Sequence, residues 1–218
     1  MFLMASVFIR FYQSNIYRFS QLSNNSYKSG DSFSREAKKQ GYRSRSAFKL
    51  LEINKKDSLI KKGMKILDLG SFPGGWTQVA SSYAGNQGLV VAIDKKKMEP
   101  LSKITFFQMN IESLIDNQYM ELSEFIPFNL VLSDLAPNIS GIREKDDAEM
   151  ISLLKVVFKI TEDVLKKKGS LLVKIFQGES FNFAKNYMDT NFEKVRIRKP
   201  SSSRSNSSET YLLATGRK

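Results

Sequence analysis

Short apolar runs of strand length alternate along this chain with helical stretches, and this alternation restricts the folds that it can adopt. The runs lie at 64–69, 89–93, 104–109, 128–133 and 171–176, and two further strand candidates follow at 193–198 and 210–215. Helical periodicity predicts helices at 34–54, 75–83, 111–125 and 146–165. Strands that are apolar throughout and separated by helices indicate a parallel sheet covered on both faces. We therefore expect one doubly wound α/β domain with a mostly parallel, seven-stranded sheet.

This domain is expected to span residues 31–218 and to follow a disordered, basic leader at residues 1–30. The leader contains Arg10, Arg18 and Lys28 but no acidic residue, and its apolar opening of nine residues is far too short to span a membrane. A basic, acid-poor leader that contains serine is typical of a mitochondrial transit peptide. An RNA-contacting arm and an upstream start codon explain the leader equally well, so these alternatives stay open.

The charge balance favours a polyanionic partner. Thirty-four basic residues stand against 22 acidic ones, which gives a net charge of +12. Nucleic acid is the simplest such partner, and a general compositional bias toward lysine is the alternative. The chain contains no cysteine and no histidine, which removes disulfides, the usual zinc sites, the thiolate nucleophile and the imidazole base. Any chemistry must therefore use lysine, carboxylates, hydroxyls or a cofactor, and no metal is expected.

The segment ILDLGSFPGGW, residues 66–76, ends the first strand in a turn that has little side chain. Gly70, Gly74 and Gly75 lie at the carboxyl end of this strand, where doubly wound sheets bind ligands and where glycine lets a ligand approach the backbone. Asp94 ends the next strand, where a carboxylate accepts hydrogen bonds from both ribose hydroxyls of an adenosine. The turn lacks the closely spaced glycines that a dinucleotide requires. It favours S-adenosylmethionine over NAD, with a purely structural turn as the alternative.

The side chains near the predicted strand ends favour a hydroxyl group as methyl acceptor. Methylation of a pyrimidine ring carbon needs a cysteine thiolate, and the segment LSDLAPN lacks the paired prolines and aromatic residue common in methylation of base amines. A hydroxyl needs orientation and help in losing its proton, which lysine and carboxylate groups supply. The candidates are Lys49, Asp134, Lys174 and Glu209. For Lys174 the alternative is a snorkelling or salt-bridged lysine. Lys49 and Glu209, each taken singly, are better explained as solvated surface charges.

Five stretches of the chain resemble the FtsJ/RrmJ family of ribosomal RNA large-subunit 2′-O-ribose methyltransferases. They are GYRSRSAFKLLEI, ILDLGSFPGGWTQVA, LVLSDLAPNISG, GSLLVKIFQGESF and RIRKPSSSRSNSSETYLLATG, and they follow the family's order and spacing. The resemblance implies a Rossmann-like methyltransferase fold with S-adenosyl-L-methionine as cofactor. It also implies methyl transfer to the ribose 2′-hydroxyl of a uridine in large-subunit ribosomal RNA.

The resemblance further implies roles for individual residues. The family's Lys-Asp-Lys-Glu catalytic tetrad falls on Lys49, Asp134, Lys174 and Glu209, with Lys174 orienting or deprotonating the hydroxyl. The family's cofactor contacts fall on Gly74, Trp76, Asp94, Asn110 and Asp134. Gly70 and Gly75 of the glycine turn complete the expected cofactor-binding set. Asn110 replaces the aspartate usual in the family, and Ser71-Phe72 replaces two residues that are usually small. The residues expected to contact RNA phosphates are Arg43, Arg45, Lys199 and Arg204.

The expected partner is large-subunit ribosomal RNA within the assembled large ribosomal subunit, with the protein acting as a monomer and away from membranes. The resemblance of the body to bacterial members favours the cytoplasm, and a transit function of the leader would place the protein in the mitochondrial matrix instead. Two other functions remain open. One is 2′-O-methylation of another RNA, such as a tRNA or a cap, and the other is a non-catalytic RNA-binding role in ribosome assembly, against which the complete tetrad argues.

Overall fold

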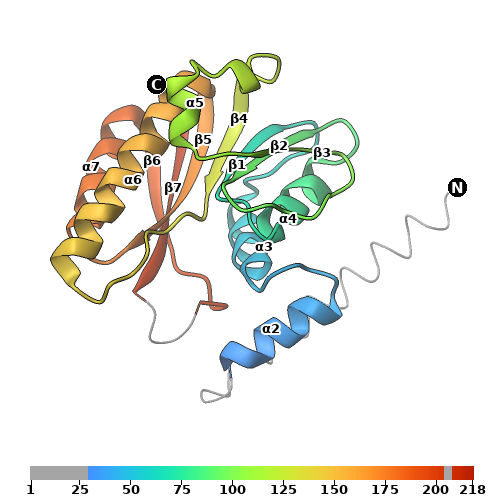
Figure 1. The fold of residues 1–218 in the computed structure, drawn as a ribbon, viewed down its shortest axis with the longest axis horizontal. Coiled ribbons are helices and arrows are strands. Elements are labelled where there is room, and N and C mark those ends of the chain that lie inside the picture. The colour runs from blue at the N-terminus through green and yellow to red at the C-terminus, as the bar shows by residue number, and fades with distance from the viewer. Residues whose placement is uncertain (1–28, 204–207) are drawn as a thin grey trace, which may run out of the picture.

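Seven strands form one sheet in the order β3-β2-β1-β4-β5-β7-β6 (Figure 1). The computed structural model describes residues 29–203 and 208–218. The strands are β1 (Lys65–Leu69), β2 (Leu89–Asp94), β3 (Ile104–Gln108), β4 (Phe128–Ser133), β5 (Leu165–Phe176), β6 (Phe192–Arg198) and β7 (Glu209–Arg217). The first five strands pair in parallel, whereas β7 runs antiparallel to both β5 and β6. The predicted doubly wound, mostly parallel sheet of seven strands is confirmed.

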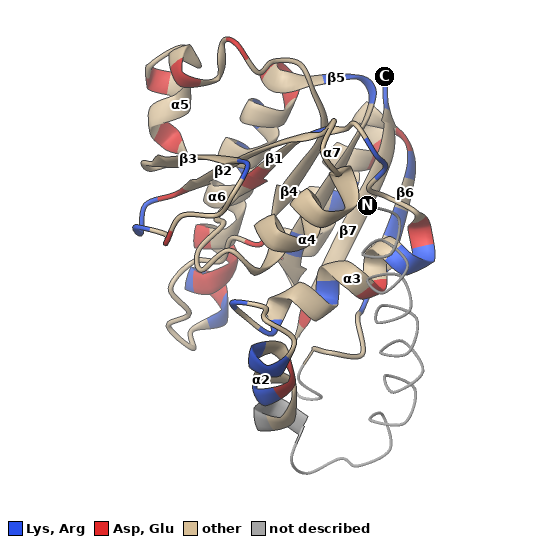
Figure 2. Cartoon of the chain, turned by 90° about the vertical axis from the view of Figure 1, so that its right-hand side faces the viewer, with Lys and Arg blue, Asp and Glu red and all other residues tan. Residues whose placement is uncertain are grey.

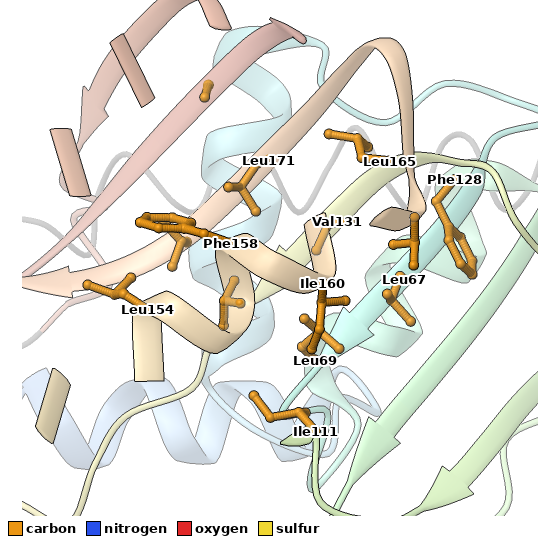
Figure 3. Packing of buried hydrophobic residues seen from close by; sticks show 14 of the residues in the cluster. Leu67, Leu69, Ile111, Phe128, Val131, Leu154, Phe158, Ile160, Leu165 and Leu171 are labelled. Atoms are coloured by element: carbon orange, nitrogen blue, oxygen red, sulfur yellow. The ribbon is translucent and has the colours of Figure 1, made fainter. Parts of the chain in front are cut away.

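Helices cover both faces of this sheet. They are α2 (Ser29–Lys39), α3 (Ser46–Asp57), α4 (Gly75–Ala84), α5 (Glu112–Asp116), the short 3₁₀ helix η2 (Met120–Leu122), α6 (Arg143–Val164) and α7 (Glu179–Asn191). Side chains alternate along each strand, so Ile66 packs into the core beneath α3 and α4, whereas Leu67 and Leu69 pack into the core beneath α6 and α7. Figure 3 shows the second of these cores, where Leu154 and Phe158 of α6 lie over the sheet.

The helix expected at 34–54 is two helices, because the chain turns after residue 39. Gly41 has φ +78°, and the backbone N–H of Tyr42 donates to the carbonyl oxygen of Ala37 at 2.8 Å while that of Gly41 donates to Lys38 at 3.1 Å. This pair of hydrogen bonds is the Schellman motif that ends helices at a left-handed glycine. It lets α3 leave the direction of α2 and pack on the sheet.

Other element bounds also differ from the expectation. The helix expected at 111–125 is limited to the short α5 and η2, separated by Gln118 and Tyr119 at positive φ. Strand β5 begins at Leu165, earlier than the apolar run at 171–176, and its pairing with β4 is irregular between Phe128 and Leu130. Helix α7 was not predicted.

No helix within residues 29–203 and 208–218 is long and apolar enough to cross a membrane.

The topology directs the functional candidates to one edge of the sheet. The chain leaves β1 toward β2 on one side and reaches β4 on the other, so the strand order reverses beside the carboxyl end of β1. Ligands of doubly wound folds bind in the crevice at such a reversal. Because β7 is antiparallel, its first residue, Glu209, lies opposite Phe176 at the end of β5. The start of β7 therefore joins the carboxyl ends of the parallel strands.

Candidate active site

Lys174 and Asp134 form an ion pair at the carboxyl edge of the sheet. Strands β4 and β5 are neighbours, with Ser133 opposite Val173, so the residues that follow each lie side by side. The Lys174 Nζ donates to the main-chain oxygen of Asp134 at 2.6 Å and lies 3.3 Å from its Oδ1. The two side chains are only 11% and 17% exposed. A lysine within the otherwise apolar run 171–176 of β5 is thus stabilised by a carboxylate and a carbonyl oxygen.

Lys49 and Glu209 form a second ion pair beside the first. Helix α3 carries Lys49 onto the sheet, where its Nζ lies 2.6 Å from Glu209 Oε1 and 2.8 Å from Oε2. Burial raises the pKa of Glu209, but the hydrogen bond and charge of Lys49, together with the charge of Lys174, outweigh it, so that the pKa is lowered overall. Glu209 is therefore an anion at neutral pH.

Tyr211 connects the two pairs and was not among the predicted site residues. Its hydroxyl lies 3.0 Å from Asp134 Oδ1 and 3.1 Å from Glu209 Oε1, and one hydroxyl proton can serve only one of these acceptors at a time. Burial, with the charges of Asp134 and Glu209, holds the pKa of Tyr211 well above its usual range. The strand period places Tyr211 on the same face of β7 as Glu209, but that spacing alone does not reveal its contact with Asp134. The four predicted tetrad residues and Tyr211 form one network.

A cleft of about 810 Å³ opens in front of this network. It is lined by the turn after β1, the ends of β2 and β3, the loop after β4, and one side of α6. The predicted site residues that line it are Gly70, Asp94, Asn110, Asp134 and Lys174. Lys174 and Asp134 thus face the cleft directly, whereas Lys49 and Glu209 reach it through Tyr211 and Asp134.

Asp94 is held in place by the backbone of the two turns that follow β1 and β2. Its Oδ2 accepts a hydrogen bond from the N–H of Phe72 at 2.9 Å, and its Oδ1 accepts one from the N–H of Lys96 at 2.8 Å. Each carboxylate oxygen keeps a further lone pair. A fixed carboxylate with two remaining acceptor sites, facing a cleft of nucleoside size, fits the ribose of an adenosine cofactor.

The glycines of the turn are required for different structural reasons. Gly70 and Gly74 have φ of +78° and +110°, which other residues rarely adopt. A Cβ on Gly75 would lie 2.2 Å from the Ser44 Oγ, so this glycine lets the segment before α3 approach. Trp76 is buried, and its indole N–H donates to the carbonyl oxygen of Ser46 at 2.9 Å. The Trp76 side chain packs α4 against α3, so a cofactor contact at Gly75 or Trp76 would use the backbone.

Asp68 lies buried beneath the turn and was also missed. Its Oδ2 accepts a hydrogen bond from the Thr77 hydroxyl at 2.6 Å, while its Oδ1 has no hydrogen-bond partner in the described ranges. Burial, with smaller contributions from the charges of Asp134 and Asp94, raises the pKa of Asp68 to about 7. The sequence signal for Asp68 is a single carboxylate within the apolar run ILDL, where a charged group would be costly to bury. Asp68 fixes β1 to α4 and so supports the turn between them.

The residues expected to contact RNA differ in their surroundings. The Arg43 guanidinium donates to the carbonyl oxygens of Glu99 at 2.6 Å and Pro100 at 2.8 Å, so it fastens the loop after β2. Arg45 donates to the carbonyl oxygen of Ser202 at 3.3 Å. Lys199 is exposed, and Arg204 lies outside the described residues. Of the three that are described, Lys199 is the exposed one, and its surroundings fit a phosphate contact most directly.

Comparison with known proteins agrees with this arrangement. Residues 42–217 match the model of the FtsJ-like methyltransferase family. The chain belongs to this family. It is 43% identical over 187 residues to ribosomal RNA large subunit methyltransferase E of Marinobacter nauticus, covering 85% of this chain and 90% of the relative. The Legionella pneumophila protein of the same name is 45% identical over 189 residues, covering 85% and 91%.

Solved structures extend the likeness to the fold. A Plasmodium falciparum protein described as a ribosomal RNA methyltransferase superposes with a TM-score of 0.70 at 29% identity, covering 81% of this chain and 98% of that one. A chain of the fibrillarin/Nop5p complex superposes with a TM-score of 0.57 at 14% identity, covering 80% and 84%, which shows a shared fold alone. As an FtsJ-like methyltransferase, the protein carries its lysine–carboxylate network at the edge where this fold binds its ligands.

Proposed function

We propose that this protein transfers a methyl group from S-adenosyl-L-methionine to the ribose 2′-hydroxyl of a uridine in large-subunit ribosomal RNA, as a step of ribosome maturation. The observation that carries the proposal is the Lys174–Asp134 pair, which faces the cleft and is backed by Tyr211, Glu209 and Lys49. The names of the Marinobacter and Legionella relatives support the choice of RNA.

The cofactor is held, in this proposal, at the β1–β2 side of the cleft. Asp94 would accept hydrogen bonds from the ribose hydroxyls, Asn110 would accept one from the adenine amine through its side-chain carbonyl, and Gly70 would let the cofactor approach the backbone. When bound, S-adenosyl-L-methionine supplies a methyl group activated by a sulfonium cation. Asn110 offers one acceptor oxygen where an aspartate would offer two, so this contact is expected to be weaker than in relatives that have aspartate.

Lys174 acts on the hydroxyl that receives the methyl group. As an ammonium held by Asp134 it donates a hydrogen bond to the 2′-oxygen and orients it, and as a free amine it accepts the hydroxyl proton. In either form, the 2′-oxygen would take the methyl group that the cofactor supplies, and its proton would pass to Lys174 or to water. Tyr211 and the Lys49–Glu209 pair keep Asp134 in position. The proposed roles of these residues require neither a metal ion nor a covalent intermediate.

The proposed setting is a monomer that acts on the assembled large ribosomal subunit in the cytoplasm. A transit role of residues 1–30, which lie mainly outside the described residues, would place the same reaction in the mitochondrial matrix. Residues 31–218 then form the methyltransferase domain. Methylation of a tRNA or a cap, and a non-catalytic role in ribosome assembly, are the competing functions.

Mapping of ribose methylation on total RNA tests this proposal. Cells that lack the protein should lose methylation at one uridine of large-subunit ribosomal RNA, and the parent gene should restore it while a Lys174→Ala gene should not. A change confined to tRNA or to caps would assign the reaction to those substrates instead. An unchanged methylation map, with no S-adenosyl-L-methionine binding by calorimetry, would favour the assembly role.

A further inference from the structure

Three lysines and one exposed aromatic ring lie together at the rim of the cleft. Lys95, Lys96 and Lys97 directly follow β2, and all three are exposed. Phe72 lies in the turn after β1 with 45% of its surface exposed. Phe72, Lys95 and Lys96 line the cleft. None of these four residues has a part in the methyl transfer proposed above.

Asp94 brings the ring and one lysine together. The backbone N–H groups of Phe72 and Lys96 donate to different oxygens of the Asp94 carboxylate, at 2.9 Å and 2.8 Å. The Lys96 Nζ then lies 5.3 Å from the centre of the Phe72 ring, which is within the range of a cation–π contact. Asp94 therefore fixes the backbone that carries this aromatic side chain, although the ring itself is not buried.

The lysine run has no ion-pair partner in the part of the chain that the structure describes. The ion pairs among residues 29–203 and 208–218 do not involve Lys95, Lys96 or Lys97. Four carboxylates line the cleft as well, those of Asp94, Glu112, Asp134 and Glu149. Asp134 is paired with Lys174 at 3.3 Å and Glu149 with Lys145 at 3.9 Å. S-adenosyl-L-methionine carries a sulfonium cation, so three additional ammonium groups at the rim do not favour the cofactor. They favour a polyanion.

We propose that Phe72 and Lys95–Lys97 form a surface that binds RNA beside the nucleotide to be methylated. The base of a neighbouring, unpaired nucleotide stacks on the Phe72 ring, and the lysines contact the adjoining phosphates. An aromatic platform flanked by cations is the usual means of holding single-stranded RNA. The inference rests on the proposed function, because it takes the target ribose to lie at Lys174 in the same cleft.

Binding of a short fluorescein-labelled oligouridine to the full-length protein tests this surface. Loss of the stacking contact in Phe72→Ala should weaken binding by about tenfold, and Phe72→Tyr should restore it. A triple variant, Lys95→Gln with Lys96→Gln and Lys97→Gln, should lower the slope of log affinity against log salt concentration by roughly 2, as expected for three phosphate contacts on a single strand. Melting temperatures close to the parent value would show that the variants are folded.

A second lysine run provides a matched control. Lys166, Lys167 and Lys168 are also exposed and begin β5, at the edge of the sheet opposite the cleft. Replacing all three by Gln removes the same charge and should leave the salt slope close to the parent value. An equal effect of the two triple variants would overturn the proposal, since the loss would then reflect net charge alone.

Calorimetry with S-adenosylhomocysteine separates RNA from cofactor. Cofactor affinity should be unchanged in Phe72→Ala and in both lysine triples. Weaker cofactor binding with unchanged oligouridine binding would assign Phe72 to the cofactor and overturn the proposal, as would unchanged binding of both. The proposed reaction can fail independently of this surface. If RNA binding depends on Phe72 but the protein methylates no ribosomal RNA, the RNA-binding surface is supported and the proposed methylation is refuted.

Discussion

At the scale of single residues, the site consists of two ion pairs whose carboxylates share one phenol. Lys174 with Asp134, and Lys49 with Glu209, are each largely shielded from water. Removing one member of a buried pair leaves its partner uncompensated and costs about 3–5 kcal/mol when burial is complete. Substitutions in this network therefore affect both stability and chemistry, and a useful variant must separate the two effects.

Lys174→Ala should abolish methyl transfer while cofactor binding survives, because the expected cofactor contacts lie on other strands and on Asp134. Loss of one positioned proton-transfer group typically lowers the rate by about 10²–10⁴-fold. Lys174→Arg keeps the cation but cannot act as a base at ordinary pH. Initial rates on purified large ribosomal subunits, beside calorimetry of cofactor binding, measure both variants.

The two variants together define the role of Lys174. Activity retained in Lys174→Arg but not in Lys174→Ala would make Lys174 an orienting cation, and loss in both would make it a base. Parent-like rates in both would remove Lys174 from the site. Urea unfolding of each variant shows whether Asp134, deprived of its 3.3 Å partner, has destabilised the fold.

Asp94→Ala should weaken S-adenosyl-L-methionine binding by about 1.5–3 kcal/mol, the usual loss when hydrogen bonds to a charged group are removed. The same substitution also frees the backbone N–H groups of Phe72 and Lys96, so part of the loss would come from a looser turn. Asp94→Asn keeps one acceptor oxygen and should give an intermediate affinity. Calorimetry measures all three proteins, and equal affinities would reject the ribose contact.

Asp68→Asn should change how stability depends on pH. Because burial raises the pKa of Asp68 to about 7 in the folded state, against an ordinary value near 4 in the unfolded chain, the folded state keeps a proton that the unfolded state loses between these pH values. Stability therefore falls as pH rises through this window and stays lower above it, by on the order of 4 kcal/mol. Asparagine cannot ionise, so the difference in unfolding free energy between parent and variant should drift in the variant's favour from pH 4 to 7. A constant difference across this range would contradict the assignment.

At the scale of elements, the site depends on how α3 is fastened to the strands at the end of the chain. The Asp57 carboxylate accepts two hydrogen bonds from the Arg198 guanidinium, at 2.6 and 2.7 Å, and Glu52 accepts from the N–H and hydroxyl of Ser201 at 2.9 Å. These contacts join the last turns of α3 to the end of β6 and the residues that follow it. They hold Lys49 of α3 against Glu209 of β7.

Asp57→Ala should destabilise the protein by about 3–5 kcal/mol, because Arg198 would lose its carboxylate in a site where the Asp57 side chain is only 6% exposed. Glu193→Ala is the matched control. It removes a carboxylate paired with Lys168 on the surface, where an ion pair contributes about 0–1 kcal/mol. Urea denaturation measures both, and equal losses would show that α3 is not held by Asp57.

At the scale of the whole molecule, the parts predicted correctly are those set by local pattern. The continuous apolar runs identified β1 to β4 to within a residue or two. The four residues that the resemblance assigned to a tetrad lie together in the structure. The strand pairing that places Tyr211 opposite Lys174 depends on tertiary contacts, which no local period encodes. Likewise, Gly75 is required by the approach of Ser44 from a distant segment, and a glycine in a turn does not reveal which neighbour approaches it.

The basic residues are also distributed over the whole molecule rather than confined to the cleft. Lys and Arg mark α2 and several exposed loops in Figure 2. Helix α2 alone carries Arg35, Lys38 and Lys39. This helix precedes the family match, which begins at residue 42. Its attachment to the domain is apolar, because Ala37 is buried and the Phe33 ring lies 6.0 Å from that of Phe48. Within the first 41 residues, α2 therefore packs on the domain, whereas the sequence of residues 1–20 shows no periodicity that would bury an apolar face.

Two truncations test that division. A chain that starts at Gln21 should keep the unfolding free energy of the full-length protein, because residues 1–20 show no periodicity that would bury an apolar face. A chain that starts at Tyr42 loses α2 and exposes the fully buried Phe48, which should cost roughly 1.5–3 kcal/mol of burial. Urea unfolding of the three proteins gives the comparison. If the shorter truncation already lost the cooperative transition, the leader would be part of the folded domain and the boundary proposed near residue 31 would be wrong.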